Sequence, residues 1–376
     1  MNEDKRPWLE RPIHPALPAI SNEVLVFGVI LILAFLSRFY DLGTRVMSHD
    51  ESLHTYFSWL LYKGQGYQHT PMMHGPLQFH LLALSYYLFG VSDFTARIPA
   101  ALFSIAMIWM LWYWRRYLGK AGALIAGLLM LISPYMLFYG RYVRNEAFSG
   151  FAGLLMIYVV LRYLESGEKR YLYWLTISLL INFTAKETAF IYTAQALLFL
   201  AFYFIRQIVT NYWGNDTAYR AFIISLSVGV LLLGAALGAG VYAKNNDSLT
   251  AIETAAPADP FAPQSPISPA ASGSLSLNIV FAGVALLAFL AAAYFLIRGY
   301  GWEKIRAERS FDLLILTGTI VLPMLTPFIS KLFGWTIPST APELSALTSV
   351  EIAKLAIAIV LTKSPFTNFC PHWAFY

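Results

Sequence analysis

The sequence predicts an all-α polytopic membrane protein, for three reasons. Its 376 residues are 58% hydrophobic and only 12% charged, whereas about 25% of residues are charged in a typical soluble domain. Apolar stretches of roughly 17–25 residues recur along the chain, the length that a helix needs to cross a hydrocarbon core of about 30 Å. Lys and Arg, 26 against 21 Asp and Glu, gather in loops as they do in membrane proteins. The lipid bilayer is therefore the expected partner, and the positive balance does not indicate nucleic acid.

The first apolar segment, Asn22 to Phe39, is predicted to be a retained span. A polar, Pro-rich tail (residues 1–21) precedes it, and no small-residue cleavage site follows it. In the next loop, Ser52 to Tyr62 has Leu and Phe side chains on one helical face, which predicts a helix lying in the membrane interface. The apolar run from Leu77 to Phe89 is short for a span and is predicted to be interfacial or re-entrant.

The remaining spans are apolar runs between charged loops. Residues 244–276, rich in Ala, Pro and Ser, are predicted to form a flexible outer linker. Residues 362–376 break the span pattern and are expected to be irregular, through truncation or a shifted reading frame. With the first span, the total is about nine or ten crossings. The later predicted spans are 98–114, 121–139, 147–164, 171–184, 189–205, 221–242, 277–297, 311–329 and a weak candidate from about Val350.

Loop charge predicts the side that each loop faces. Every second loop is rich in Lys and Arg, as in the loop that contains Arg115, Arg116 and Lys120. The positive-inside rule places these loops and the N-terminus in the cytoplasm, so the alternate loops face the outside of a plasma membrane. Cys370 is the only cysteine, which excludes an internal disulfide framework.

Four charged groups share the predicted outer side, each at a membrane edge. A charged side chain near lipid costs free energy to keep there, which favours a functional role. Arg and Lys suit a phosphate, and a carboxylate can deprotonate an acceptor hydroxyl. A reaction of a sugar linked to a lipid phosphate would use both kinds of group, the cations and the carboxylate. The groups are His49-Asp50-Glu51, His69 to Pro76, Arg141 to Glu146, and Lys186-Glu187.

Each group also has a structural interpretation. Asp50 and Glu51 could belong to a solvated loop, and Arg141 and Arg144 could extend towards lipid headgroups. Arg144 could pair with Glu146 for structural reasons alone. The histidines of the first outer loop match no strong metal-ligand spacing. The shared side of the four groups, rather than any one of them, favours the functional interpretation.

A set of short motifs is distributed over roughly residues 20–205. They are His49-Asp50-Glu51, His74-Gly75-Pro76-Leu77, Leu88 to Asp93, Ala96-Arg97-Ile98-Pro99, Tyr139 to Glu146, and Thr184 to Thr188. As a set they resemble GT-C fold glycosyltransferases of the protein O-mannosyltransferase and aminoarabinose-transferase group, most closely the flippase activity-associated proteins. The resemblance implies a GT-C-like helix bundle over residues 22–361, with juxtamembrane helices in its first outer loop.

The resemblance further implies an enzyme that transfers a sugar from a polyprenyl-phosphate donor to an acceptor on the extracytoplasmic side. Asp50 matches the catalytic acidic position, as a base or a metal ligand, and Glu51 is its neighbour. Glu146 stands near the second acidic position. His74 would replace a Lys that the family often has before this proline. The other positions expected to bind substrate are Arg97, Arg141, Arg144, Asn145, Lys186 and Glu187.

Two questions stay open at this level. A divalent metal ion is a possible cofactor, with Asp50 and His49 as candidate ligands; no other cofactor is expected. The main alternative function is a non-catalytic protein that binds a lipid-linked sugar or assists a flippase. A secondary transporter is less favoured, because no inverted repeat or Gly/Pro-broken helix is evident.

Overall fold

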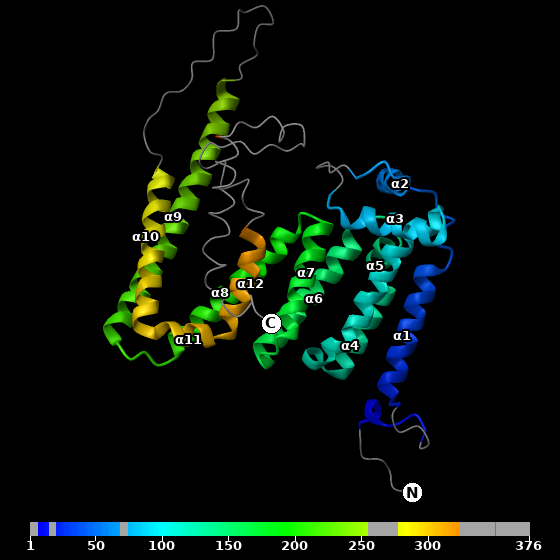
Figure 1. Cartoon of the computed structure of the whole chain (residues 1–376), viewed down its shortest axis with the longest axis horizontal. Helices are drawn as coiled ribbons and strands as arrows, with labels where there is room; N and C mark the ends of the chain where they lie inside the picture. Colours follow the sequence, from blue (N-terminus) through cyan, green and yellow to red (C-terminus); the bar gives the residue numbers. More distant parts are fainter. Residues whose placement is uncertain (1–6, 15–19, 68–73, 255–276, 323–349, 351–376) are drawn as a thin grey trace, which may run out of the picture. The chain divides into compact units, whose positions relative to one another are not determined.

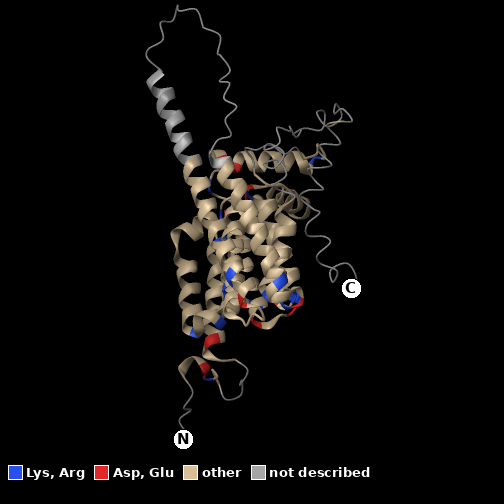
Figure 2. Ribbon diagram, turned by 90° about the vertical axis from the view of Figure 1, so that its left-hand side faces the viewer, with Lys and Arg blue, Asp and Glu red and all other residues tan. Residues whose placement is uncertain are grey.

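A computed structural model describes residues 7–14, 20–67, 74–254, 277–322 and Val350. These residues form helices and one isolated bridge, between Pro12 and Ser21. The all-α prediction is confirmed. Six described helical stretches are long and apolar enough to cross a membrane, and Figure 2 shows that most of the helical length carries no charged residue. The predicted segment from Val350 and the C-terminal residues 362–376 lie outside the described residues, apart from Val350 itself.

The chain divides into two compact units, one of residues 1–202 and 312–376, the other of residues 203–311. The prediction of a single domain over residues 22–361 did not anticipate this division. The first unit contains the described residues of the four charged groups singled out from the sequence; residues 69–73, in the second group, lie outside the described part.

Helices α1 (Asn22–Phe39), α4 (Asp93–Ile132), α6 (Glu146–Ser166) and α7 (Arg170–Ala185) build the first unit. Helix α4 packs against both α1 and α6, and α6 packs against α7 (Figure 1). Buried leucines, methionines and valines of α6 and α7 form the largest apolar core, which also takes in Leu200 of α8 (Ala189–Thr210) and Leu313 of α12 (Arg309–Val321).

Helix α4 contains the segment predicted as 98–114 and the first part of the segment predicted as 121–139. Gly119 interrupts it with a φ of 72°, a value that glycine adopts without strain. The two arms fold back on each other, because Ile108 and Leu131 meet in one cluster with Ile30 of α1. The second predicted segment ends early: Pro134 starts a separate short helix, α5 (Pro134–Tyr139), capped by the side chain of Ser133. A proline cannot donate the backbone hydrogen bond that would continue the first helix.

Two helices of the first outer loop differ in direction from the long ones. Helix α3 (Leu77–Phe89) runs crosswise to α1 and α4 (Figure 1), and its predicted bounds are confirmed. Helix α2 (His49–Tyr62) starts three residues before the predicted amphipathic segment. A capping box explains the earlier start: Ser48 and Glu51 satisfy each other's backbone N–H groups.

A buried ion pair joins α2 to α4. Glu51 accepts from Arg97 at 3.0 and 3.1 Å, and both side chains are almost fully buried. Glu51 also accepts from the backbone N–H of Val143 and from Arg45. Burial opposes the charge on Glu51, but these hydrogen bonds outweigh it and lower its pKa below the usual value. Arg97 donates in addition to the carbonyl of Leu42.

The second unit is a hairpin of two long helices followed by a short third helix. Helix α9 (Asp216–Thr254) packs along α10 (Leu277–Phe295), which continues through a π-helical turn (Leu296–Gly301) into α11 (Trp302–Ala307). Trp213 and Tyr300 are central to its buried core. The predicted linker 244–276 needs a correction, because α9 extends to Thr254 and residues 244–254 are helical. Residues 255–276 lie outside the described part.

Removing one member of the buried ion pair should destabilise the first unit strongly. We expect Arg97→Gln to lower the free energy of unfolding by about 3–5 kcal/mol, since Glu51 would keep an uncompensated buried charge. Arg170→Gln, which breaks an exposed pair with Glu168, should cost under about 1 kcal/mol. Denaturation of the purified protein in detergent measures both changes. Equal losses of unfolding free energy in the two variants would contradict the conclusion that Glu51 and Arg97 form a buried ion pair.

Candidate active site

A chain of alternating charges lies at one end of the first unit. Asp50 of α2 contacts Arg144 at 3.1 Å, and Arg144 contacts Glu146 at 3.4 Å. Glu146, the first residue of α6, in turn accepts from Lys186 at 2.8 Å. Three stretches of sequence therefore meet here: the start of α2, the segment before α6, and the end of α7. The structure brings together four of the residues singled out from the sequence.

The local backbone explains why these side chains converge. Glu146 occupies the first turn of α6, where the helix dipole favours a negative charge. Lys186 is the extended residue that ends α7, and its N–H still bonds to the carbonyl of Asn182. Gly75 allows the chain before α3 to approach this point. Its N–H bonds to the carbonyl of Ala185, and a Cβ at this position would overlap the backbone oxygen of Thr184.

Two histidines extend the cluster. His74 bonds through Nδ1 to Glu187 at 2.8 Å, so the second and fourth sequence groups also meet. The ring of His54, on α2, lies 6.5 Å from the ring of His74 and is buried. Burial, with the nearby His74 and Arg144, lowers the pKa of His54 to about 4. His54 is therefore neutral at neutral pH. The burial of Glu187 opposes its charge, but backbone and His74 hydrogen bonds outweigh it and lower its pKa.

A cavity of about 320 Å³ adjoins the chain of charges. Glu146 and Lys186 line it, together with three tyrosines from α5 and α8. The buried Oε2 of Glu146 and Oγ of Ser149 have no hydrogen-bond partner among the described residues. Buried polar atoms are rarely left in this state without a ligand or water to bind. Sequence reasoning missed the tyrosines and Ser149, because single Tyr and Ser residues in apolar runs carry no pattern. The tyrosines are Tyr135, Tyr139 and Tyr192.

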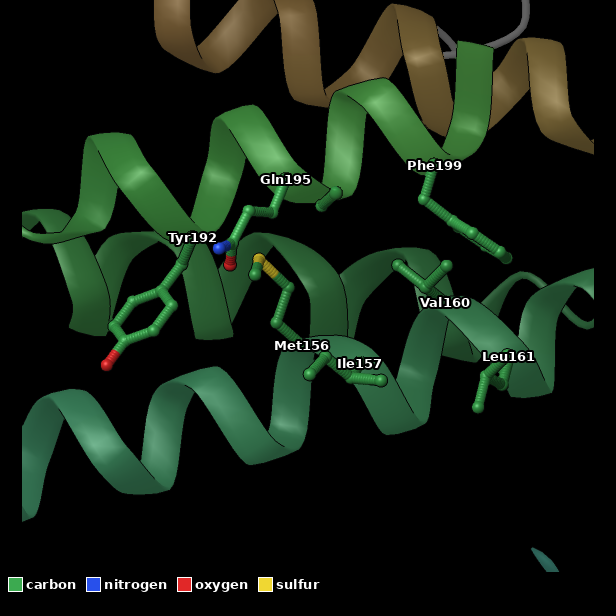
Figure 3. Close-up of a pocket in the computed structure, with 8 residues that line it drawn as sticks. Met156, Ile157, Val160, Leu161, Tyr192, Gln195 and Phe199 are labelled. Carbon is green, nitrogen blue, oxygen red and sulfur yellow. The ribbon is translucent and has the colours of Figure 1, made fainter. Parts of the chain in front are cut away.

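An apolar pocket of about 270 Å³ continues along α6 and α8. Tyr192 lines both this pocket and the polar cavity. Figure 3 shows Met156, Ile157 and Val160 of α6 facing Tyr192 and Phe199 of α8. The two spaces therefore share a wall, one with charged groups and one almost wholly apolar.

The other candidate residues lie outside this cavity's lining. Arg141 donates to the backbone carbonyls at the end of α1, those of Ser37, Tyr40 and Asp41. Glu51 and Arg97 form the buried pair described above. Asn145, directly before α6, is fully buried, and its amide atoms have no hydrogen-bond partner among the described residues.

The donors near Asp50 do not fit a divalent cation. The Asp50 carboxylate faces the guanidinium of Arg144, which would repel a cation, and its neighbour His49 is exposed at the start of α2. Among the described residues, no group of three or more His, Cys, Asp or Glu side chains could hold a metal ion. Divalent cations of the Mg²⁺ type prefer several oxygen ligands.

One protein-family model matches part of the chain. Residues 73–230 match the family model described as dolichyl-phosphate-mannose-protein mannosyltransferase. The chain is similar to that family over these residues. The matched region contains Arg144, Glu146 and Lys186, and it supports a multi-pass membrane glycosyltransferase that uses a polyprenyl-phosphate-linked sugar. Comparisons with curated proteins and with solved structures gave no match.

The buried His54 should make stability depend on pH. Its folded pKa of about 4 lies below the ordinary value of 6.5, so the unfolded chain takes up a proton first as the pH falls. Stability should therefore decline from about pH 6.5 to about pH 4, by at most about 3 kcal/mol from this group. His54→Gln should flatten the decline measured by thermal unfolding in detergent. The exposed His80 provides the control: His80→Gln should keep the wild-type slope, and an unchanged slope in His54→Gln would refute the argument.

Proposed function

We propose that the protein is a membrane glycosyltransferase that moves a sugar from a polyprenyl-phosphate donor to an acceptor hydroxyl on the extracytoplasmic side. The observation that carries the proposal is the ion-pair chain from Asp50 through Arg144 and Glu146 to Lys186, beside a partly apolar cavity. Cations suited to a phosphate and a carboxylate suited to a hydroxyl proton occur there within contact distance. The family match supports the same class of donor.

Arg144 and Lys186 are the groups placed to bind the donor phosphate. Both are partly exposed, at 30% and 18% of the side chain, so a ligand can reach them. Their present partners are carboxylates, which a phosphate can replace as an anionic partner. Glu146, between them, fixes the spacing of the two cations, because it contacts both. The sugar would then occupy the cavity lined by the tyrosines of α5 and α8.

Asp50 is the proposed general base. As the acceptor oxygen bonds to the anomeric carbon, its proton passes to the Asp50 carboxylate, and the bond from that carbon to the phosphate oxygen breaks. The departing polyprenyl phosphate retains the electron pair, and Arg144 and Lys186 stabilise its charge. The side chain of Asp50 is 44% exposed, which leaves it open to an acceptor arriving from solvent.

The apolar pocket between α6 and α8 suits the isoprenoid chain of such a donor. Its walls are almost wholly apolar, and it shares Tyr192 with the polar cavity. Burying an isoprenoid there would contribute roughly 25 cal/mol for each Å² of apolar surface removed from water. A donor with a charged head and a long apolar chain therefore matches the two adjoining spaces.

Replacing Asp50 separates the enzymatic proposal from its main alternative. Asp50→Asn should lower the rate of sugar transfer by about 10²–10⁴-fold, the usual contribution of a general base, while the donor lipid still binds. Transfer from radiolabelled polyprenyl-phosphate sugars to membrane extract measures the rate. Glu168→Gln, in the turn between α6 and α7 at the opposite end of α6 from Glu146, is the control and should retain full activity.

Wild-type transfer by Asp50→Asn would remove Asp50 from the mechanism. If the wild-type protein binds the donor lipid but transfers no sugar with any extract, the chain is instead a non-catalytic lipid-linked-sugar binding protein.

A further inference from the structure

A second cavity, of about 590 Å³, lies at the opposite end of the first unit. It is formed by the start of α1, the turn between the two arms of α4, and the last turns of α6. It has no part in the mechanism above. Helix α6 begins at Glu146 in the proposed active site and ends at Ser166, one residue after Glu165. Its 21 residues correspond to about 30 Å of helix, the thickness of a hydrocarbon core.

Cations predominate on the wall of this cavity, which we name the basic cavity. One carboxylate, that of Glu23, lines it together with four cationic side chains. Three aromatic rings complete the polar and apolar lining. The cations are Arg115, Arg116, Lys120 and Arg162, and the rings are Trp112, Tyr113 and Tyr158.

Carboxylates outside the lining hold these cations in place without neutralising all of them. Glu165 accepts from Arg116 at 2.8 Å and from Arg162 at 2.9 Å, and Glu10 accepts from Lys120 at 2.7 Å. Four cations against Glu10, Glu23 and Glu165 leave one positive charge in excess. A guanidinium has five N–H donors, so the Arg116 bond through Nε leaves its terminal nitrogens able to bind an anion.

The aromatic residues place the cations at a membrane boundary. The guanidinium of Arg115 stacks 3.7 Å from the ring centre of Trp112 and lies 3.5 Å from Glu23, which fixes its orientation. Trp and Tyr are enriched where helices leave the hydrocarbon core, at the depth of lipid headgroups. Arg115 and Arg116 retain 39% and 57% of their side-chain exposure, so a headgroup can reach both.

We infer that the basic cavity binds the phosphate of an anionic phospholipid headgroup, in the membrane leaflet opposite the proposed active site. The phosphate diester would accept from Arg115 and Arg116, and the acyl chains would lie along the apolar surfaces of α4 and α6. Basic pockets between membrane helices recognise anionic headgroups in this way. This inference is independent of sugar transfer.

Lipid titration followed by native mass spectrometry tests the inference on the whole 376-residue chain in neutral detergent. Phosphatidylglycerol should bind at least about tenfold more tightly than phosphatidylcholine, since the two share a phosphate but differ in net charge. The variant R115Q/R116Q should lose that preference. Lys169→Gln removes an exposed cation of the same end that does not line the basic cavity, and it should bind as the wild type does.

The single variant Arg116→Gln provides a second test of the inference if the double variant does not fold. Arg116 is the more exposed of the two, and its loss should weaken phosphatidylglycerol binding about threefold or more. Equal affinity for the two lipids in the wild type would overturn the inference, as would unchanged binding in a folded Arg116→Gln protein. Competition by glycerol phosphate as strong as that by the lipid would overturn the assignment to a lipid headgroup.

Discussion

The proposed active site depends on the hydrogen bonds that the buried carboxylate of Glu51 accepts. This carboxylate binds Arg97 of α4, the backbone N–H of Val143 and the N–H of Ser48. Asp50 is the residue before Glu51, and Arg144 is the residue after Val143. Fixing Glu51 against Val143 therefore sets the start of α2 beside the segment before α6 and brings Asp50 within 3.1 Å of Arg144. Glu51 is best understood as a positioning residue, not a group that touches substrate.

The same constraint gives the two adjacent acids different roles. Glu51 is fully buried, and its carboxylate accepts from Arg97, Arg45 and the N–H of Val143. Its charge therefore serves to hold three segments of the chain together. Asp50 is nearly half exposed and bonded to one partly exposed cation. An adjacent pair on a helix N-terminus points in directions about 100° apart, which lets one side chain face the protein core and the other face solvent.

Much of the fold could be predicted from the sequence, because lipid imposes a length and a composition on each helix. The bounds of α1 and α3 are those expected, and the crosswise α3 agrees with its shortness. The errors have local causes. The break at Pro134 and the early start of α2 at His49 depend on single capping residues, Ser133 and Ser48. The extension of α9 to Thr254 crosses a polar stretch that has no apolar periodicity.

The sequence could predict which segments form the candidate site, but not which of their side chains pair with each other. Charge patterns selected Asp50, Arg144, Glu146 and Lys186, and the structure brings them together. Charge patterns could not show that Glu51 and Arg97 pair in the core, because a sequence does not distinguish a buried acid from an exposed acid beside it. Nor could they reveal that Arg141 bonds to the end of α1. Pairing partners depend on tertiary contacts between residues far apart in the chain.

A double-mutant cycle on sugar transfer tests the central claim, that Asp50 and Arg144 act together in one site. The rates of wild type, Asp50→Asn, Arg144→Gln and the double variant are compared in the same donor assay. Residues in contact have coupling energies of about 0.5–3 kcal/mol. We expect the double variant to be about tenfold more active than the product of the two single effects. Strictly multiplicative effects would contradict the claim, since they would show that the two side chains act independently.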